Sequence, residues 1–190
     1  WPSLLLDHHD PQNTHLVVYL VSSFSCARAI YFAIMETGHA PLALHWTFGF
    51  SRNIANGVHS LSNGQSSSVF YPSANTGVVY DYVKRSQKLL QGHCNQIACV
   101  ALSNDKQWLV TADSGQDSLM VVWNTRTGNP TKTMFNAYSL GAISVDVSWD
   151  SSYLSVLSAP DEQSASGMSQ YISIWELKSS SETPLFTDEV

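Results

Sequence analysis

The chain has 190 residues, of which 44% are hydrophobic and 13% are charged, and its formal net charge is −6 at pH 7. A charged fraction about half the roughly 25% of typical soluble domains, together with many Ser, Thr, Val and aromatic residues, favours strands over helices. Lysine and arginine form no cluster in the sequence. Because a nucleic-acid-binding surface needs basic side chains to neutralise phosphates, a nucleic-acid partner is not expected.

The first 45 residues differ from the rest in their pattern of apolar and polar residues. Leu16–Ile34 is a nearly continuous apolar run, close to the roughly 20 residues that a membrane span needs. Arg28 lies inside the run, at a cost of about 2.5–3.5 kcal/mol near a helix centre. A secretory signal would require Lys or Arg before the apolar run, and none precedes it. We therefore expect no membrane segment and interpret residues 1–45 as an extension outside the domain, either non-native sequence or a poorly packed tail.

The sequence contains three cysteines, Cys26, Cys94 and Cys99. The spacing of Cys94 and Cys99 fits no zinc motif, and three reduced thiols are expected. Four amino-terminal histidines also lack the spacing of metal ligands and are interpreted as solvated. They are His8, His9, His15 and His39. The sequence therefore predicts neither a metal site nor a cofactor.

From Trp46 onward, short apolar alternations are separated by turn signals such as Asn56-Gly57, Asn63-Gly64 and Thr127-Gly128-Asn129-Pro130. This texture is typical of short antiparallel strands, and no stretch has an apolar stripe of helical period. The predicted strands are Ile97–Leu102, Trp108–Ala112, Leu119–Trp123, Thr131–Phe135, Ile143–Val147, Tyr153–Leu157 and Tyr171–Trp175.

Two units of this region repeat. They run from Gly92 to Asn124 and from Ala142 to Glu176, and their first halves align at an offset of 45 residues. Each unit ends in an alternating apolar strand that closes on a tryptophan, Trp123 or Trp175. A weaker earlier copy carries Tyr80 in the tryptophan position. A period of about 40–45 residues with a Gly-His start and a terminal tryptophan predicts the blades of a β-propeller.

On these features the chain resembles the WD-repeat family, in which a buried His–Ser/Thr–Asp–Trp network ties a four-stranded blade together. The resemblance implies a structural tetrad of His93, Thr111, Asp117 and Trp123, with Asp117 six residues before Trp123. Such a network satisfies buried polar groups that would otherwise cost about 1–3 kcal/mol each. The implied fold is all-β: a partial WD-repeat β-propeller of about three four-stranded antiparallel blades over residues 46–190. Because propellers have typically 4–8 blades, the remaining blades are expected in sequence outside this chain.

The second unit departs from the family pattern. It lacks Gly-His, carries Val156 in the threonine position and has Ser169 six residues before Trp175. That blade is expected to rely on packing. Its long loop, Ala159–Gln170, is a candidate protein contact, with a disordered Ser-rich loop as the alternative.

A catalytic interpretation of His93, Thr111 and Asp117 is rejected. A triad needs a nucleophile that is open to substrate and an oxyanion hole, whereas this spacing places the three groups inside a blade. The glycine-containing turns match no common phosphate-binding motif. The protein is therefore not expected to be an enzyme.

A more particular resemblance covers about three quarters of the chain. Its segments, in order, are His45–Phe50, Ser73–Val83, Lys88–His93, Trp108–Pro130 and Ser144–Ser158. They resemble the amino-terminal propeller of cilia- and flagella-associated WD-repeat proteins of the calmodulin- and spoke-associated complex, at the base of radial spoke three in motile axonemes. The resemblance implies a scaffold in the cytoskeleton of the cilium or flagellum that helps anchor radial spokes. The implied partners are radial-spoke-base components and the calmodulin-associated complex.

Two other functions stay open. The echinoderm-microtubule-associated-protein-like family has a related layout and implies a cytoplasmic microtubule-binding protein. The acidic balance of the chain counts against direct binding to tubulin, whose surface is itself acidic. A generic WD-repeat adaptor is the other alternative, because a fold does not fix a function.

Overall fold

The structure is a computed structural model that describes residues 17–21, 43–64, 66–135, 140–161, 169–179, 181 and 183–190. All regular secondary structure in these residues is β-strand. The strands are β1 (Val17–Val21), β2 (Ala43–Phe48), β3 (His59–Ser60), β4 (Ser68–Ser73), β5 (Thr76–Asp81), β6 (Ser86–Leu90), β7 (Ile97–Leu102), β8 (Trp108–Asp113), β9 (Leu119–Asn124), β10 (Pro130–Phe135), β11 (Ala142–Val147), β12 (Tyr153–Ser158), β13 (Tyr171–Glu176) and β14 (Phe186–Glu189).

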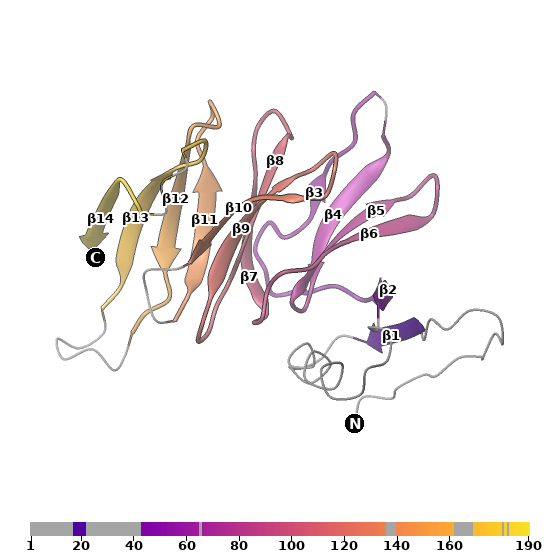
Figure 1. The fold of residues 1–190 in the computed structure, drawn as a ribbon, viewed down its shortest axis with the longest axis horizontal. Helices are drawn as coiled ribbons and strands as arrows, with labels where there is room; N and C mark the ends of the chain where they lie inside the picture. The colour runs from indigo at the N-terminus through magenta and orange to yellow at the C-terminus, as the bar shows by residue number, and fades with distance from the viewer. Residues whose placement is uncertain are drawn as a thin grey trace.

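Twelve of the strands form three four-stranded antiparallel sheets, β3–β6, β7–β10 and β11–β14. We call them sheets one, two and three. Within each sheet the strands lie in chain order, so every connection is a hairpin between neighbours. Figure 1 shows the sheets side by side, with sheet two between the other two.

The prediction of an all-β fold is confirmed, and so are the seven predicted strands, whose bounds differ from β7–β13 by no more than one residue at either end. The alternating apolar pattern located these strands because one face of each lies against a neighbouring sheet. The short edge strand β14 was not predicted. Its four residues are all exposed, so no alternation of apolar and polar residues marks it.

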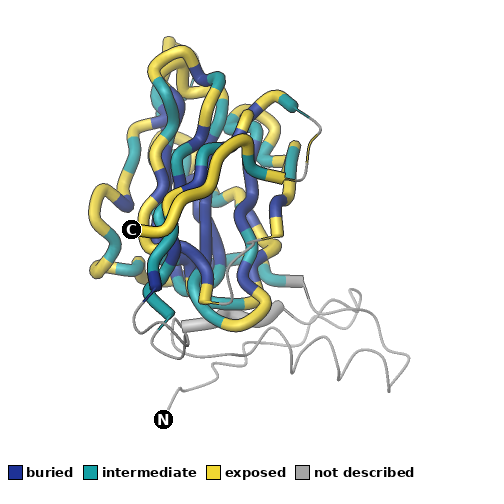
Figure 2. The backbone as a smooth tube through the Cα atoms, turned by 90° about the vertical axis from the view of Figure 1, so that its left-hand side faces the viewer, coloured by how far each residue is buried: buried dark blue, intermediate teal, exposed yellow. Residues whose placement is uncertain are grey.

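Two hydrophobic clusters hold the sheets together. Between sheets one and two, Phe70 and Leu90 pack with Leu109, Val121 and Trp123. Between sheets two and three, a second set of buried residues packs from both sides: Cys99, Ala101, Val110, Ala112, Met120, Val122, Met134, Ala142, Val145, Leu154, Val156, Trp175 and Leu177. Figure 2 shows the buried backbone gathered in the middle of the strands and the exposed backbone in the turns and towards the C-terminus. Sheet two is therefore covered on both faces.

Outside the three sheets, β1 and β2 form a parallel pair. Apart from β1 and the start of β2, residues 1–45 lie outside the described residues, and the predicted boundary at residue 45 stays a prediction. Most of the loop Ala159–Gln170 also lies outside them. Within the part of the chain that the structure describes, no helix is long and apolar enough to cross a membrane.

Candidate functional site

Three of the four residues predicted for the tetrad meet inside sheet two. Thr111 on β8 and Trp123 on β9 are 0% and 2% exposed, and His93, which precedes β7, is 4% exposed. The indole Nε1 of Trp123 donates to Thr111 Oγ1 at 2.8 Å. Thr111 Oγ1 lies 2.6 Å from His93 Nε2. A continuous chain of hydrogen bonds therefore links the start of the sheet to its third strand.

The fourth member is Asp113, and the prediction of Asp117 is wrong. Asp113 Oδ2 lies 3.1 Å from His93 Nδ1, and the side chains of both residues are fully buried. Its other oxygen, Oδ1, accepts the backbone N–H of Leu119 at 2.8 Å. Asp117 instead lies exposed in the turn between β8 and β9, in the left-handed conformation with φ of 56°.

The error came from counting back from the tryptophan across a turn of unknown length. Asp113 ends strand β8, and residues 114–118 form the connection to β9. Side chains two residues apart on a strand lie on the same face, so Thr111 and Asp113 both reach His93. That alternation was visible in the sequence and identifies the right aspartate without any assumption about the turn.

The hydrogen bonds assign a direction to every proton in the network. An indole nitrogen can only donate, so Thr111 Oγ1 accepts from Trp123 and donates its one hydrogen to His93 Nε2. His93 then carries its hydrogen on Nδ1 and donates it to Asp113. Each group is used, and none faces solvent. The arrangement stabilises the sheet and offers no free nucleophile.

Sheet three keeps the layout of the network but changes its chemistry. Ser158 stands where sheet two has Asp113, and its hydroxyl accepts the backbone N–H of Tyr171 at 2.9 Å, as Asp113 accepts that of Leu119. The indole of Trp175 donates to Ser173 on its own strand at 2.9 Å. Ser169, which sequence spacing placed in the aspartate position, instead donates to Glu189 at 2.6 Å. In sheet three, serine hydroxyls thus accept the indole and backbone hydrogen bonds that Thr111 and Asp113 accept in sheet two.

The outward face of sheet one is contacted by β2. The ring of Trp46 lies edge-on to that of Tyr80, with centroids 6.3 Å apart and an interplanar angle of 82°. Gln87 on β6 donates to the carbonyl of Thr47 and accepts its N–H, both at 2.9 Å. Its side chain also reaches the hydroxyl of Tyr71 at 3.2 Å. No local pattern in the sequence indicates this role of Gln87, since the contact joins residues 40 positions apart.

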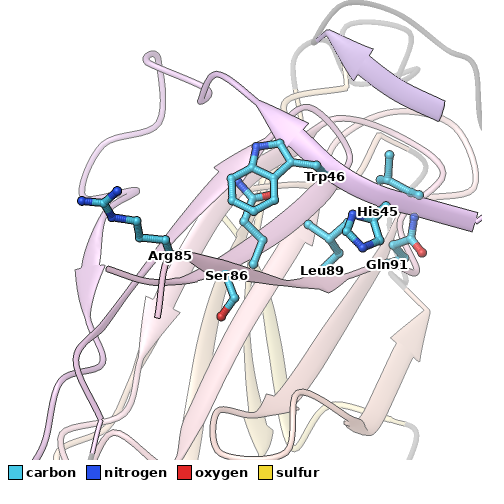
Figure 3. Close-up of a pocket in the computed structure, with 8 residues that line it drawn as sticks. His45, Trp46, Arg85, Ser86, Leu89 and Gln91 are labelled. Atoms are coloured by element: carbon cyan, nitrogen blue, oxygen red, sulfur yellow. The ribbon is translucent and has the colours of Figure 1, made fainter. Parts of the chain in front are cut away.

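A cavity of about 510 Å³ lies between β2 and β6 (Figure 3). Its lining is mixed polar and apolar, with the residues Leu44, His45, Trp46, Arg85, Ser86, Gln87, Leu89 and Gln91. In Figure 3 the guanidinium of Arg85 points away from His45 and Gln91. A ligand site requires polar groups that converge on one point, and the polar groups of this cavity do not.

The two described cysteines differ in exposure and do not combine into a metal-binding group. Burial, with a smaller contribution from Asp113, raises the pKa of the Cys99 thiol to about 12. The thiol therefore stays protonated at neutral pH and behaves as a small apolar side chain. Cys94 is exposed, and both are free thiols. Among the described residues, no group of three or more His, Cys, Asp or Glu could hold a metal ion.

Comparison with known proteins relates this chain to one family. Residues 42–190 match the family model described as the CFAP251 N-terminal domain. The chain is 42% identical over 148 residues to cilia- and flagella-associated protein 251 of Tetrahymena thermophila, an alignment that covers 78% of the chain and 15% of that protein. It is 39% identical over 143 residues to the protein of the same name from Chlamydomonas reinhardtii, with 75% and 17% covered. The chain thus spans only about a sixth of the length of these relatives.

A solved structure supports the fold alone. Kuenenia stuttgartiensis hydrazine synthase superposes with a TM-score of 0.53 at 13% sequence identity, covering 65% of this chain and 34% of that one. At this identity the likeness carries no information about activity.

Proposed function

The chain belongs to the CFAP251 N-terminal domain family, and from this premise we propose that it is part of an interaction scaffold in the axoneme of motile cilia or flagella. The observation that carries the proposal is its 42% and 39% identity to two cilia- and flagella-associated proteins over three quarters of its length. The proposed role is to help anchor radial spokes. The proposed partners are proteins of the radial-spoke base and of the calmodulin-associated complex.

The proposed scaffold is a WD-repeat β-propeller in which sheets one to three are successive blades. The order of the strands supports this: four consecutive strands form each sheet, and the next four strands of the chain form the next sheet. The hydrogen-bond chain from His93 to Trp123 supports it for sheet two. Blades of this type present their turns on two opposite surfaces, where partners bind.

The outer face of sheet three fits a further blade. In sheet two, Met120 lies beneath sheet three and is 1% exposed. Ile172 has the corresponding place on β13 and is 37% exposed, and Tyr153 on the same face is 46% exposed. An additional sheet stacked as sheet three stacks on sheet two would bury these side chains, at about 25 cal/mol per Å² of apolar surface.

We also propose that the scaffold has no catalytic activity of its own. His93 and Thr111, the residues with the closest likeness to catalytic groups, are buried and fully hydrogen-bonded. A triad would need its nucleophile at the surface and an oxyanion hole beside it.

The test is fractionation of cilia that carry an epitope-tagged full-length protein. The tag is expected to stay with detergent-extracted axonemes together with radial-spoke proteins, and to be lost from axonemes that lack radial spoke three. Recovery in the detergent-soluble fraction would contradict the scaffold. Pelleting of the purified protein with bare microtubules, without other axonemal proteins, would favour the cytoplasmic microtubule-binding alternative.

A further inference from the structure

The turn between β11 and β12 displays a tryptophan to solvent. Trp149 is 82% exposed, the largest value among the exposed large hydrophobic residues that the structure describes. Of the three other tryptophans in the same repeats, Trp123 and Trp175 are 2% and 1% exposed, and Trp108 is half-buried. A large aromatic surface in water is the kind of side chain on which protein interfaces most often depend.

The backbone that carries Trp149 is held in one conformation. Ser148 Oγ donates to Asp150 Oδ1 at 2.6 Å and accepts the backbone N–H of Tyr153 at 2.9 Å. The N–H of Ser151 donates to the carbonyl of Ser148 at 2.8 Å. The indole is thus presented from a fixed turn, and little backbone entropy would be lost when it binds.

Sheet two contains the same turn without the tryptophan. Ser103 Oγ donates to Asp105 Oδ1 at 2.6 Å and accepts the N–H of Trp108 at 2.9 Å, which repeats the two bonds of the later turn. Asn104 stands in the place of Trp149. The turn therefore needs no tryptophan for its geometry.

Asn104 also shows what a further blade would do to this position. Sheet two is covered on both faces, by sheets one and three, and yet Asn104 is exposed. A sheet stacked on sheet three would therefore leave Trp149 in solvent. Propeller completion does not explain this side chain.

The charged residue next to Trp149 is acidic. Asp150 follows it directly and is exposed, while Glu176 and Lys178 are exposed at and beyond the end of β13, where Lys132 of sheet two donates to the carbonyl of Glu176. The Ser148 hydroxyl and the N–H and hydroxyl of Ser152 lower the pKa of Asp150, so its carboxylate stays ionised at neutral pH. Figure 1 shows the β11–β12 and β13–β14 turns at the same end of the sheet.

The matched turn of sheet two has a different balance. Lys106 follows Asp105 there, whereas Ser151 follows Asp150 in sheet three. Both residues have φ of 57°, so the two backbones match and only the charge differs. The turn of sheet three therefore carries one carboxylate and no basic side chain, whereas the turn of sheet two carries a carboxylate and a lysine.

We propose that Trp149 anchors a basic segment of a partner protein, with an arginine or lysine side chain stacked on the indole and the carboxylate of Asp150 beside it. A cation over an aromatic face is attracted by the ring quadrupole, and neighbouring carboxylates add to that attraction. The proposal needs only this turn and does not depend on where in the cell the protein acts.

The first test uses the full chain labelled with 5-fluorotryptophan and followed by fluorine NMR. The Trp149 resonance is assigned from the Trp149→Phe variant, and the probe is a decapeptide of alternating Gly and Arg. We expect the Trp149 resonance to shift saturably with this peptide, and Asp150→Asn, whose amide oxygen can still accept from Ser148 and Ser152, to weaken the binding severalfold. No shift, or an equal shift with the Gly-Glu decapeptide, would overturn the proposal.

A matched control distinguishes this turn from a generic exposed tryptophan. The Asn104→Trp, Trp149→Asn double variant moves the indole to the same backbone geometry beside Lys106. We expect about tenfold weaker binding of the Gly-Arg peptide by this variant. An undiminished affinity would show that any exposed indole suffices and would refute the proposed site.

The second test identifies the partner segment in the full-length protein. A photo-crosslinking p-benzoylphenylalanine is placed at position 149 and, as the control, at position 104. We expect a cross-link at position 149 alone, to a peptide that contains arginine or lysine beside the cross-linked residue. A cross-link to an acidic or purely apolar segment, or no difference between the two positions, would reject the basic partner.

Discussion

The side-chain amide of Gln87 pairs with the peptide group of Thr47 as one strand pairs with another. Gln87 Nε2 donates to the Thr47 carbonyl and Gln87 Oε1 accepts the Thr47 N–H, both at 2.9 Å. One side chain of sheet one therefore holds strand β2 by its backbone.

We expect Gln87→Met to release β2 without unfolding sheet one. Methionine has a similar size but can neither donate to nor accept from Thr47, and the two lost bonds are worth about 0.5–1.5 kcal/mol each. Amide exchange at Thr47 should become faster while exchange in β5 stays unchanged. Lys88→Met is the control, because Lys88 donates to the carbonyl of Arg126 and not to β2. Unchanged exchange at Thr47 in Gln87→Met would contradict the pairing.

We expect substitution of Asp113 to lower the free energy of unfolding much more than substitution of Asp117. Asp113→Ala leaves His93 Nδ1 and the Leu119 N–H without an acceptor inside the sheet, at about 1–3 kcal/mol or more. Asp113→Asn should cost less, because its carbonyl still accepts. Asp117→Ala should change the free energy of unfolding by less than about 1 kcal/mol, since the residue is exposed. Urea denaturation of the three variants ranks them, and a larger loss for Asp117→Ala would restore the original assignment.

Threonine is expected to stabilise sheet two and to destabilise sheet three. Thr111→Val removes the hydroxyl that bridges His93 and Trp123 and should cost about 1–3 kcal/mol. Val156→Thr introduces a hydroxyl at the matching position, where Trp175 already donates to Ser173. That hydroxyl would be desolvated opposite Ser173, whose oxygen already accepts the indole N–H, so we expect its burial to cost more than a bond to Ser173 returns. Thermal unfolding should show a lower Tm for both variants, and a higher Tm for Val156→Thr would mean that sheet three can rebuild the network.

Gly77 is required by the packing of Phe70. A Cβ at position 77 would lie 2.8 Å from Phe70 Cε2 and 3.2 Å from the Cβ of Leu90. Phe70 is fully buried and cannot move aside freely, so Gly77→Ala should lower the free energy of unfolding by about 1–3 kcal/mol. Gly64→Ala is the matched control, because a Cβ there would meet no atom within 4 Å. Equal stabilities of the two variants in urea would refute the packing argument.

His59 should make the fold sensitive to acid. Burial lowers the pKa of His59 below its usual 6.5, and its Nε2 is buried with no hydrogen-bond partner. The unfolded chain therefore binds a proton more readily, so stability should fall as the pH drops from about 6.5 towards the lowered pKa. His59→Gln should flatten this part of the stability profile. Measurements at pH 8, where the imidazole is neutral in both states, provide the baseline, and identical slopes below pH 6.5 would disprove the assignment.

Much of the fold could be predicted from local patterns. Alternating apolar residues located β7–β13 because each of these strands has a face that is buried against a neighbouring sheet. The 45-residue offset identified matching units, and the structure keeps it in pairs of equivalent bonds such as Ser103–Asp105 and Ser148–Asp150. Three members of the buried network, His93, Thr111 and Trp123, were also visible at their spacing.

Other features depended on contacts between distant residues. The choice of Asp113 over Asp117 depended on the residue at which β8 ends. The sequence does not define that residue, because the same turn residues are compatible with turns of several lengths. The pairing of Gln87 with Thr47 and the contact of Trp46 with Tyr80 join β2 to sheet one across 34 to 40 residues.

The sequence by itself determined strands β7–β13, their repeat and the likeness to cilia- and flagella-associated proteins, because these follow from periodicity and from residue identity along the chain. Only the tertiary structure decided which aromatic side chains are buried. Trp123 and Trp175 lie near the ends of apolar strands and are buried by sheet packing, whereas Trp149 follows Ser148 in a turn and stays in solvent. Burial depends on which surfaces meet when the sheets stack, and no local pattern records that.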